Sequence, residues 1–105
     1  AKGSVWEGGI RVPAIFRWPG RIPAGAVTSE IASTIDLLPT IAAACGASLP
    51  RHEIDGLNLM PLLEKPQGRS PRQDFLYFGT QLQYKAGDAR PENTANLLAV
   101  RQGPW

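Results

Sequence analysis

The sequence is poor in the residues that mark several common classes of protein. It has one cysteine, which excludes an internal disulfide bond and any zinc site built from several cysteines. Its 11 basic and 9 acidic residues leave a net charge of +2 and form no long basic run, so we expect no nucleic-acid partner. No apolar stretch reaches the roughly 18 residues of a membrane-spanning helix, so we expect no membrane span.

Glycine and proline, by contrast, are abundant, with 11 and 10 copies among 105 residues. Their number favours many turns and loops and argues against a helical bundle. The hydrophobic fraction of 43% and the charged fraction of 19% are those of a globular chain rather than a disordered tail. A chain of this length holds one domain at most.

The clearest expected element is a helix over residues 33–45. Ser33 or Thr34 supplies an N-terminal cap, and Asp36 lies near the positive end of the helix dipole. Gly46 follows at the position where a left-handed residue commonly ends a helix. The helix carries one apolar stripe, which we expect to be buried: Ile35, Leu38, Ile41, Ala42 and Cys45.

Three stretches are expected to form strands. Residues 10–18 are rich in β-favouring side chains, and Pro13 restricts them to an edge or irregular position. Residues 74–78 and 97–101 are the other two, separated by a polar segment that contains glycine.

The rest of the chain is expected to be mainly loop. Residues 47–72 contain one short apolar turn, at 57–63, which we expect to pack against a neighbouring surface. The chain begins without an initiator methionine or a signal peptide, and we interpret both of its ends as cut points in a longer protein. We therefore expect residues 10–16 and 57–63 to expose apolar surface that other chain normally covers, and the isolated piece to self-associate.

Few side chains suggest chemistry when they are taken one at a time. Lys2 lies on a glycine-bordered turn and either contacts an anionic oxygen or is a solvated surface lysine. Gly8 and Gly9 mark either an anion-binding nest or close packing. Cys45 lies near a helix C-terminus, where the dipole disfavours a thiolate, so we expect a small buried apolar side chain rather than a nucleophile. His52, the one histidine, lies on a loop, at the rim of a site or in solvent.

The acidic residues give no metal-binding pattern. Asp36 and Asp55 have structural explanations, as a charge at a helix N-terminus and as a turn former. No Asp-x-Asp pair and no histidine-rich spacing indicates a complete metal site. Residue chemistry by itself therefore does not identify a reaction.

Four blocks, in order, resemble a known family. The first block is Lys2-Gly3-Ser4-Val5-Trp6-Glu7-Gly8-Gly9-Ile10-Arg11-Val12-Pro13. The second is Trp18-Pro19-Gly20-Arg21-Ile22. The third runs from Ser33-Thr34-Ile35-Asp36-Leu37-Leu38-Pro39-Thr40 to Gly46. The fourth is Asp55-Gly56-Leu57-Asn58-Leu59 with Pro61-Leu62-Leu63. Together they resemble the sulfatase family, which is arylsulfatase-like and part of the alkaline phosphatase superfamily.

The resemblance implies an α/β fold and a position within it. Residues 1–72 would be the end of the sulfatase catalytic domain, and residues 73–105 the start of a small, truncated C-terminal subdomain with an antiparallel sheet. One main helix and short antiparallel strands would make up this C-terminal part. Residues 74–78 and 97–105 resemble the strands of the subdomain.

The resemblance also implies a reaction, the hydrolysis of sulfate esters with a calcium ion and a formylglycine. Lys2 matches the lysine that contacts the sulfate group, and it is the one functional position that carries over. Glu7, Gly8, Gly9 and Arg11 match motif positions that we interpret as shaping the loop. Cys45 does not match the formylglycine precursor, because Gly46-Ala47-Ser48-Leu49 follows it in place of x-Pro-x-Arg. We expect the calcium ligands and the nucleophile outside these residues, and the isolated piece to be inactive.

The resemblance leaves alternatives open. A phosphodiesterase or phosphonate hydrolase of the same superfamily would bind a similar tetrahedral oxyanion, and a non-catalytic binding module could keep the same scaffold. The expected partners are a small sulfate ester or a sulfated glycan and the N-terminal portion of the same protein. Localisation is not implied, although members of the family are often exported or lysosomal.

Overall fold

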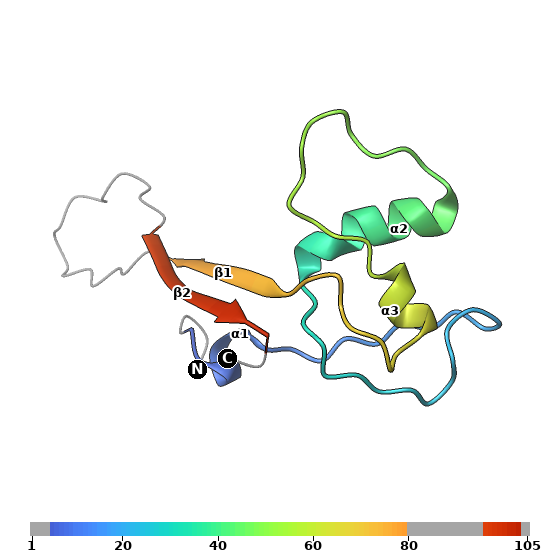
Figure 1. The fold of residues 1–105 in the computed structure, drawn as a ribbon, viewed down its shortest axis with the longest axis horizontal. Helices are drawn as coiled ribbons and strands as arrows, with labels where there is room; N and C mark the ends of the chain where they lie inside the picture. The colour runs from blue at the N-terminus through green and yellow to red at the C-terminus, as the bar shows by residue number, and fades with distance from the viewer. Residues whose placement is uncertain (1–4, 80–95, 104–105) are drawn as a thin grey trace, which may run out of the picture. The chain divides into compact units, whose positions relative to one another are not determined.

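A computed structural model describes residues 5–79 and 96–103 of the chain. They form two compact units, one from residues 5–13, 74–79 and 96–103 and the other from residues 14–73. The elements, in order, are α1 (Glu7–Ile10), the 3-10 turn η1 (Thr34–Asp36), α2 (Leu37–Cys45), α3 (Met60–Glu64), β1 (Asp74–Gly79) and β2 (Asn96–Gln102) (Figure 1). The α/β class with one main helix and a small antiparallel sheet is confirmed.

The helix predicted over residues 33–45 is confirmed, with its first turn wound as η1. Ser33 precedes it in extended conformation, and its backbone N–H donates to the Asp36 carboxylate at 2.9 Å. Gly46 ends α2 with a φ of 66°, where a side chain would be strained. The Ala47 N–H then donates to the Ala42 carbonyl at 2.8 Å, which closes the last turn.

The buried face of α2 is not the apolar stripe that the sequence predicts. Ile35, Leu38 and Ile41 are 45%, 54% and 58% exposed, and Cys45 is exposed as well. The residues that α2 and η1 bury are Asp36, Pro39, Thr40 and Ala42. The predicted burial is therefore confirmed at Ala42 and wrong at the other four residues of the stripe, Cys45 included. The polar side chains at the start of the helix, on the opposite face, take the buried partners instead.

Helix α3 and the residue before it supply most of the apolar core of residues 14–73. Leu59, Met60 and Leu62 are all less than a tenth exposed, and burial of each such side chain contributes about 1.5–3 kcal/mol. The Thr40 hydroxyl oxygen accepts a hydrogen bond of 2.9 Å from the Leu59 backbone N–H and so joins α2 to the start of α3. The predicted packing of the 57–63 turn is confirmed, whereas its predicted apolar exposure is wrong at these three residues.

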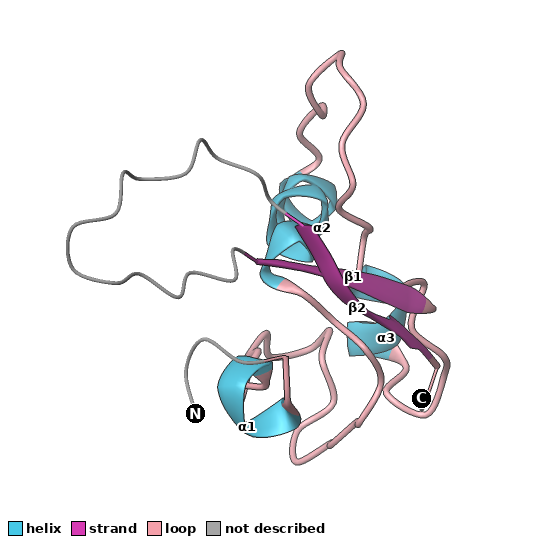
Figure 2. Cartoon of the chain, turned by 90° about the vertical axis from the view of Figure 1, so that its left-hand side faces the viewer, coloured by secondary structure: helices cyan, strands magenta, loops and turns pink. Residues whose placement is uncertain are grey.

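The two strands predicted near the C-terminus are confirmed as an antiparallel pair (Figure 2). Phe75 lies opposite Arg101 and Tyr77 opposite Ala99, and a register irregularity follows Tyr77. The rings of Phe75 and Tyr77, on one face of β1, meet edge to face with centroids 5.0 Å apart. Gly79 lies so close to β2 that a Cβ there would come within 2.7 Å of the Leu98 side chain.

The strand predicted over residues 10–18 is wrong. Ile10 ends α1, and residues 11–18 run as irregular chain. In the described ranges β1 and β2 pair with each other, so residues 11–18 have no ladder to join, and Pro13 has no N–H to donate. The predicted apolar exposure of this stretch is confirmed, with Val12 72% and Ile15 94% exposed.

Candidate functional site

The residue that sequence analysis singled out, Lys2, lies outside the described residues. The rest of its motif is described from Val5 onward and forms one short helical turn, α1. The Gly9 N–H donates to the Trp6 carbonyl at 2.7 Å, and the Arg11 N–H donates to the Glu7 carbonyl at 2.8 Å. A Cβ at Gly8 would meet nothing within 4 Å, so close packing does not explain that glycine in the described structure.

Two arginines converge on the carboxylate of Glu7. Arg11 Nη1 lies 2.9 Å from Glu7 Oε2, four residues along the same turn. Arg101 Nη1, from β2, lies 2.7 Å from Glu7 Oε1. The hydrogen bond from Arg11 is the main reason why the pKa of Glu7 is lowered, and the charge of Arg101 adds to it. Glu7 is thus an ionised, doubly paired carboxylate that links α1 to the end of β2.

A second charged cluster, Asp36 with Arg72, lies inside residues 14–73. Arg72 Nη2 is 2.5 Å from Asp36 Oδ1, and Arg72 Nε is 2.9 Å from Oδ2. The Leu57 backbone N–H donates to Oδ1 at 2.8 Å. Asp36 is 0% exposed and Arg72 7% exposed, so this is a buried ion pair with several hydrogen bonds.

The partners of Asp36 decide its protonation state. Burial on its own would raise the pKa of this carboxyl, because water no longer solvates the charge. The hydrogen bond from Arg72 and the backbone N–H groups of Leu57 and Ser33 outweigh burial, so the pKa of Asp36 is lowered. Asp36 is therefore a carboxylate held by fixed donors, which suits a structural role better than proton transfer.

The same cluster fixes three loops in place. Arg72 Nη2 also donates to the Asp55 carbonyl at 2.8 Å, on the loop that leads to α3. The Ser70 hydroxyl donates to the Ile31 carbonyl at 2.6 Å and accepts the Arg72 N–H at 3.1 Å. In the described ranges no fully buried side-chain nitrogen or oxygen atom lacks a partner. Sequence analysis missed the pair, since Arg72 lies in a loop 36 residues away with no local signal.

An exposed counterpart of this pair ties the second motif block to α3. The Arg21 guanidinium lies 4.8 Å from the centroid of the Trp18 ring, within reach of a cation–π contact. Arg21 Nε donates to Glu64 Oε1 at 3.0 Å. The Arg21 side chain is 48% exposed and the Glu64 side chain 35% exposed. Such a pair contributes little to stability, on the order of 0–1 kcal/mol.

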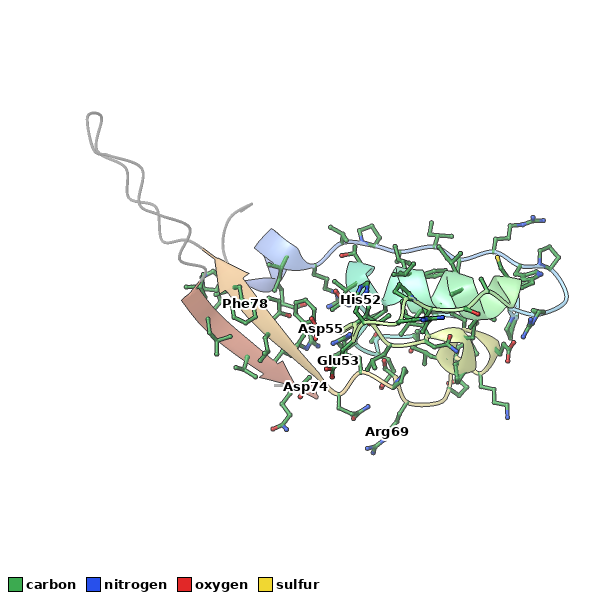
Figure 3. The ribbon with its side chains drawn as sticks, turned by 90° about the horizontal axis from the view of Figure 1, so that it is seen from above. His52, Glu53, Asp55, Arg69, Asp74 and Phe78 are labelled. Carbon is green, nitrogen blue, oxygen red and sulfur yellow. The ribbon has the colours of Figure 1, made fainter. Side chains whose placement is uncertain are left out.

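The other candidates do not assemble into a reactive site. His52, Glu53 and Asp55 lie exposed on the loop between α2 and α3 (Figure 3). Cys45 is a free, exposed thiol at the end of α2. No three His, Cys, Asp or Glu side chains in residues 5–79 and 96–103 gather in a way that could hold a metal ion. No helix in the same ranges is long and apolar enough to cross a bilayer.

Comparison with known proteins gives a consistent result. The family model for N-sulphoglucosamine sulphohydrolase, C-terminal, matches residues 1–92. Human arylsulfatase A is 43% identical over 104 residues, covering 99% of this chain and 18% of the relative. Human steryl-sulfatase is 44% identical over 99 residues, covering 91% of this chain and 16% of the relative. Dog arylsulfatase H is 50% identical over 82 residues, covering 73% of this chain and 14% of the relative.

The coverage is as informative as the identity. The chain spans less than one-fifth of the length of these relatives, so what they do as whole enzymes does not transfer automatically to it. The match to the C-terminal model nevertheless covers most of the chain, including the lysine motif, α2, α3 and β1. The chain belongs to the sulfatase family and represents its C-terminal region.

Proposed function

We propose that this chain is the C-terminal part of an enzyme that hydrolyses sulfate esters, either small molecules or sulfated glycans. The observation that carries the proposal is the match of residues 1–92 to a C-terminal sulphohydrolase model, together with relatives that include arylsulfatase A and steryl-sulfatase. In this proposal residues 1–72 end the catalytic domain, and residues 73–105 begin the small antiparallel subdomain. The chain would not turn over substrate by itself.

Lys2 is the residue through which the chain would act on substrate. An ammonium group is a compact point charge with three donors, well suited to a sulfate oxygen. Fixed donors of this kind stabilise charge that develops on oxygen as the sulfate group is transferred. Lys2 precedes a turn that holds no competing free carboxylate, because Glu7 is engaged by Arg11 and Arg101.

Calcium and formylglycine, which the family resemblance implies for the whole enzyme, do not fit the described residues. No acidic or histidine cluster is present in residues 5–79 and 96–103, and Cys45 lacks the x-Pro-x-Arg sequence after it. We propose that both groups are held by chain outside residues 1–105. The role of this chain is then to supply Lys2 and to form the small antiparallel sheet.

The test is Lys2→Ala in the full-length enzyme. Removal of one donor to a charged transition state typically costs about 10²–10³ in turnover, and we expect a loss of that size in kcat for an aryl sulfate. Lys65→Ala is the matched control, since Lys65 is an exposed lysine in the other unit and should leave kcat unchanged. Near-normal kcat for Lys2→Ala would refute the role given to Lys2.

A further inference from the structure

The fourth motif block begins with Asp55-Gly56, a dipeptide that can rearrange without an enzyme. The glycine nitrogen can attack the Cγ of the aspartate side chain, because glycine has no Cβ to hinder the approach. The nitrogen loses its proton, a carboxyl oxygen leaves as water, and a five-membered succinimide ring forms. Water then opens the ring at either carbonyl and gives aspartate or isoaspartate. Asp55 is exposed on the loop before α3, where water can reach such a ring (Figure 3).

The buried ion pair holds this dipeptide on both sides. Arg72 Nη2 donates to the Asp55 carbonyl at 2.8 Å, and the Leu57 N–H donates to Asp36 Oδ1 at 2.8 Å. Between these two bonds, Gly56 is packed so closely that a Cβ there would lie 2.2 Å from a backbone carbonyl oxygen of η1. Asp36 and Arg72 are themselves buried. The nitrogen that would attack therefore belongs to a peptide that is fixed before it and after it.

Ring closure requires this peptide to move. The Gly56 nitrogen and the Asp55 Cγ must pass from a contact distance of about 3–3.5 Å to a covalent bond in the right orientation. The ring also allows only a narrow range of rotation about the Asp55 Cα–C bond. Such a rotation displaces the carbonyl that Arg72 holds and the glycine that η1 leaves little room to shift. A molecule in which the cluster has opened locally is free of these restraints.

We propose that Asp55-Gly56 is a site of spontaneous isoaspartate formation that the Asp36–Arg72 ion pair holds closed. While the pair is intact, the dipeptide reacts only in the small fraction of molecules whose cluster is open. When the pair is broken, the dipeptide becomes free to react. Water is the only co-reactant, and the proposal is independent of the reaction that the whole enzyme catalyses.

The product itself would disturb the cluster. In isoaspartate the chain continues through the side-chain carbon, and the former Asp55 carbonyl carbon carries a free carboxylate. Arg72 Nη2 donates to that carbonyl oxygen in the native protein, so the rearrangement puts a second negative charge beside the cation that pairs with Asp36. The added methylene in the main chain also displaces the Leu57 N–H, which donates to Asp36. We therefore expect each modified molecule to be destabilised in this cluster.

The experiment incubates the full-length protein that carries this chain in water enriched in the heavy oxygen isotope. Each succinimide that hydrolyses takes up one labelled oxygen, which mass spectrometry detects in the peptide that contains Asp55. Chromatography of that peptide separates isoaspartate from aspartate. We expect wild type to label at least about 10²-fold more slowly than the same protein unfolded in urea, because the reaction waits for the open form. Arg72→Met should label about 10²-fold faster than wild type and approach the unfolded rate.

Three further variants make the test specific. Arg72→Lys keeps a positive charge but lacks the planar fork that reaches both the carboxylate and the Asp55 carbonyl, so it should label at an intermediate rate. Arg21→Met breaks the exposed ion pair with Glu64 in the same unit and should label like wild type. Asp55→Glu should label far more slowly even in urea, because its ring would need six members.

Faster labelling in both Arg72 variants than in Arg21→Met, with isoaspartate at residue 55, would support the proposal. If Arg72→Met does not fold, the comparison of Arg72→Lys with Arg21→Met decides. Wild type that labels as fast as its urea-unfolded form would overturn the proposal, because the ion pair would then give no protection. Arg72 variants that label no faster than Arg21→Met, or a peptide that takes up no label even in urea, would overturn it as well.

Discussion

Arg72→Met should destabilise residues 14–73 strongly, because it leaves the Asp36 carboxylate buried without its cation. Arg72 gives this carboxylate three of its hydrogen bonds, at 2.5, 2.9 and 3.1 Å, and Asp36 is 0% exposed. Removing one partner of a buried ion pair typically costs about 3–5 kcal/mol, whereas an exposed pair contributes about 0–1 kcal/mol. Arg21→Met, which breaks the exposed pair with Glu64, is therefore the matched control.

The assay is hydrogen exchange of the native full-length protein, read at the amides of Ser33 and Leu57. Both amides donate to the Asp36 carboxylate, so they report opening of this cluster. A loss of about 3–5 kcal/mol should speed their exchange by about 10²–10³ or more, while the amides of β1 and β2 stay unchanged. Exchange in Arg72→Met no faster than in Arg21→Met would refute the reasoning.

Three other outcomes are expected. The pKa of Asp36 is lowered in the folded state, so the contribution of its carboxylate to stability is complete above about pH 5. That contribution is lost as the pH falls through the folded pKa, which lies below 3.8. Acid titration of the same exchange rates should show this loss, and Asp36→Asn should abolish the pH dependence. Gly56→Ala should lower the melting temperature by several degrees, because the new Cβ would lie 2.2 Å from the Ile35 carbonyl oxygen. Gly8→Ala is the control, since a Cβ there meets nothing within 4 Å. Equal melting temperatures of the two variants would contradict this reasoning. Residues 1–105 expressed alone should self-associate through exposed apolar side chains such as Val12, Ile15 and Ile41, and a monomer at all concentrations in sedimentation velocity would count against that.

The elements that sequence analysis predicted correctly are those with strong local signals. The helix over residues 33–45 has a cap at Ser33, an acidic residue in its first turn at Asp36 and a glycine directly after its end at Gly46. The strands β1 and β2 have runs of β-favouring side chains, and the sheet pairs them directly. Such signals depend on residues that are close in sequence, so a single sequence is enough to recognise them.

The elements that it predicted wrongly depend on partners far along the chain. Periodicity identifies an apolar face of α2 but not whether anything in this chain covers that face. Here the covered face carries Asp36 and Thr40, whose partners lie 36 and 19 residues away. The expected strand at residues 10–18 likewise needed a neighbouring strand that the described residues do not supply.

The candidate site was predictable only through the family resemblance. Taken by itself, Lys2 would be interpreted as a surface lysine. Only the family motif around it suggests that it contacts the sulfate group. Arg101 could not be found in this way, because nothing near it in sequence marks it as a partner of Glu7, 94 residues earlier. The structure is what brings these two side chains together.

The measurement that tests the central claim most directly compares two substrates with the full-length enzyme that carries this chain. An aryl sulfate and an aryl phosphodiester with the same leaving group should be hydrolysed under identical conditions and compared by kcat/KM. The account predicts clear preference for the sulfate ester, together with the loss of that activity in Lys2→Ala. Preference for the phosphodiester, or no hydrolysis of either, would contradict it.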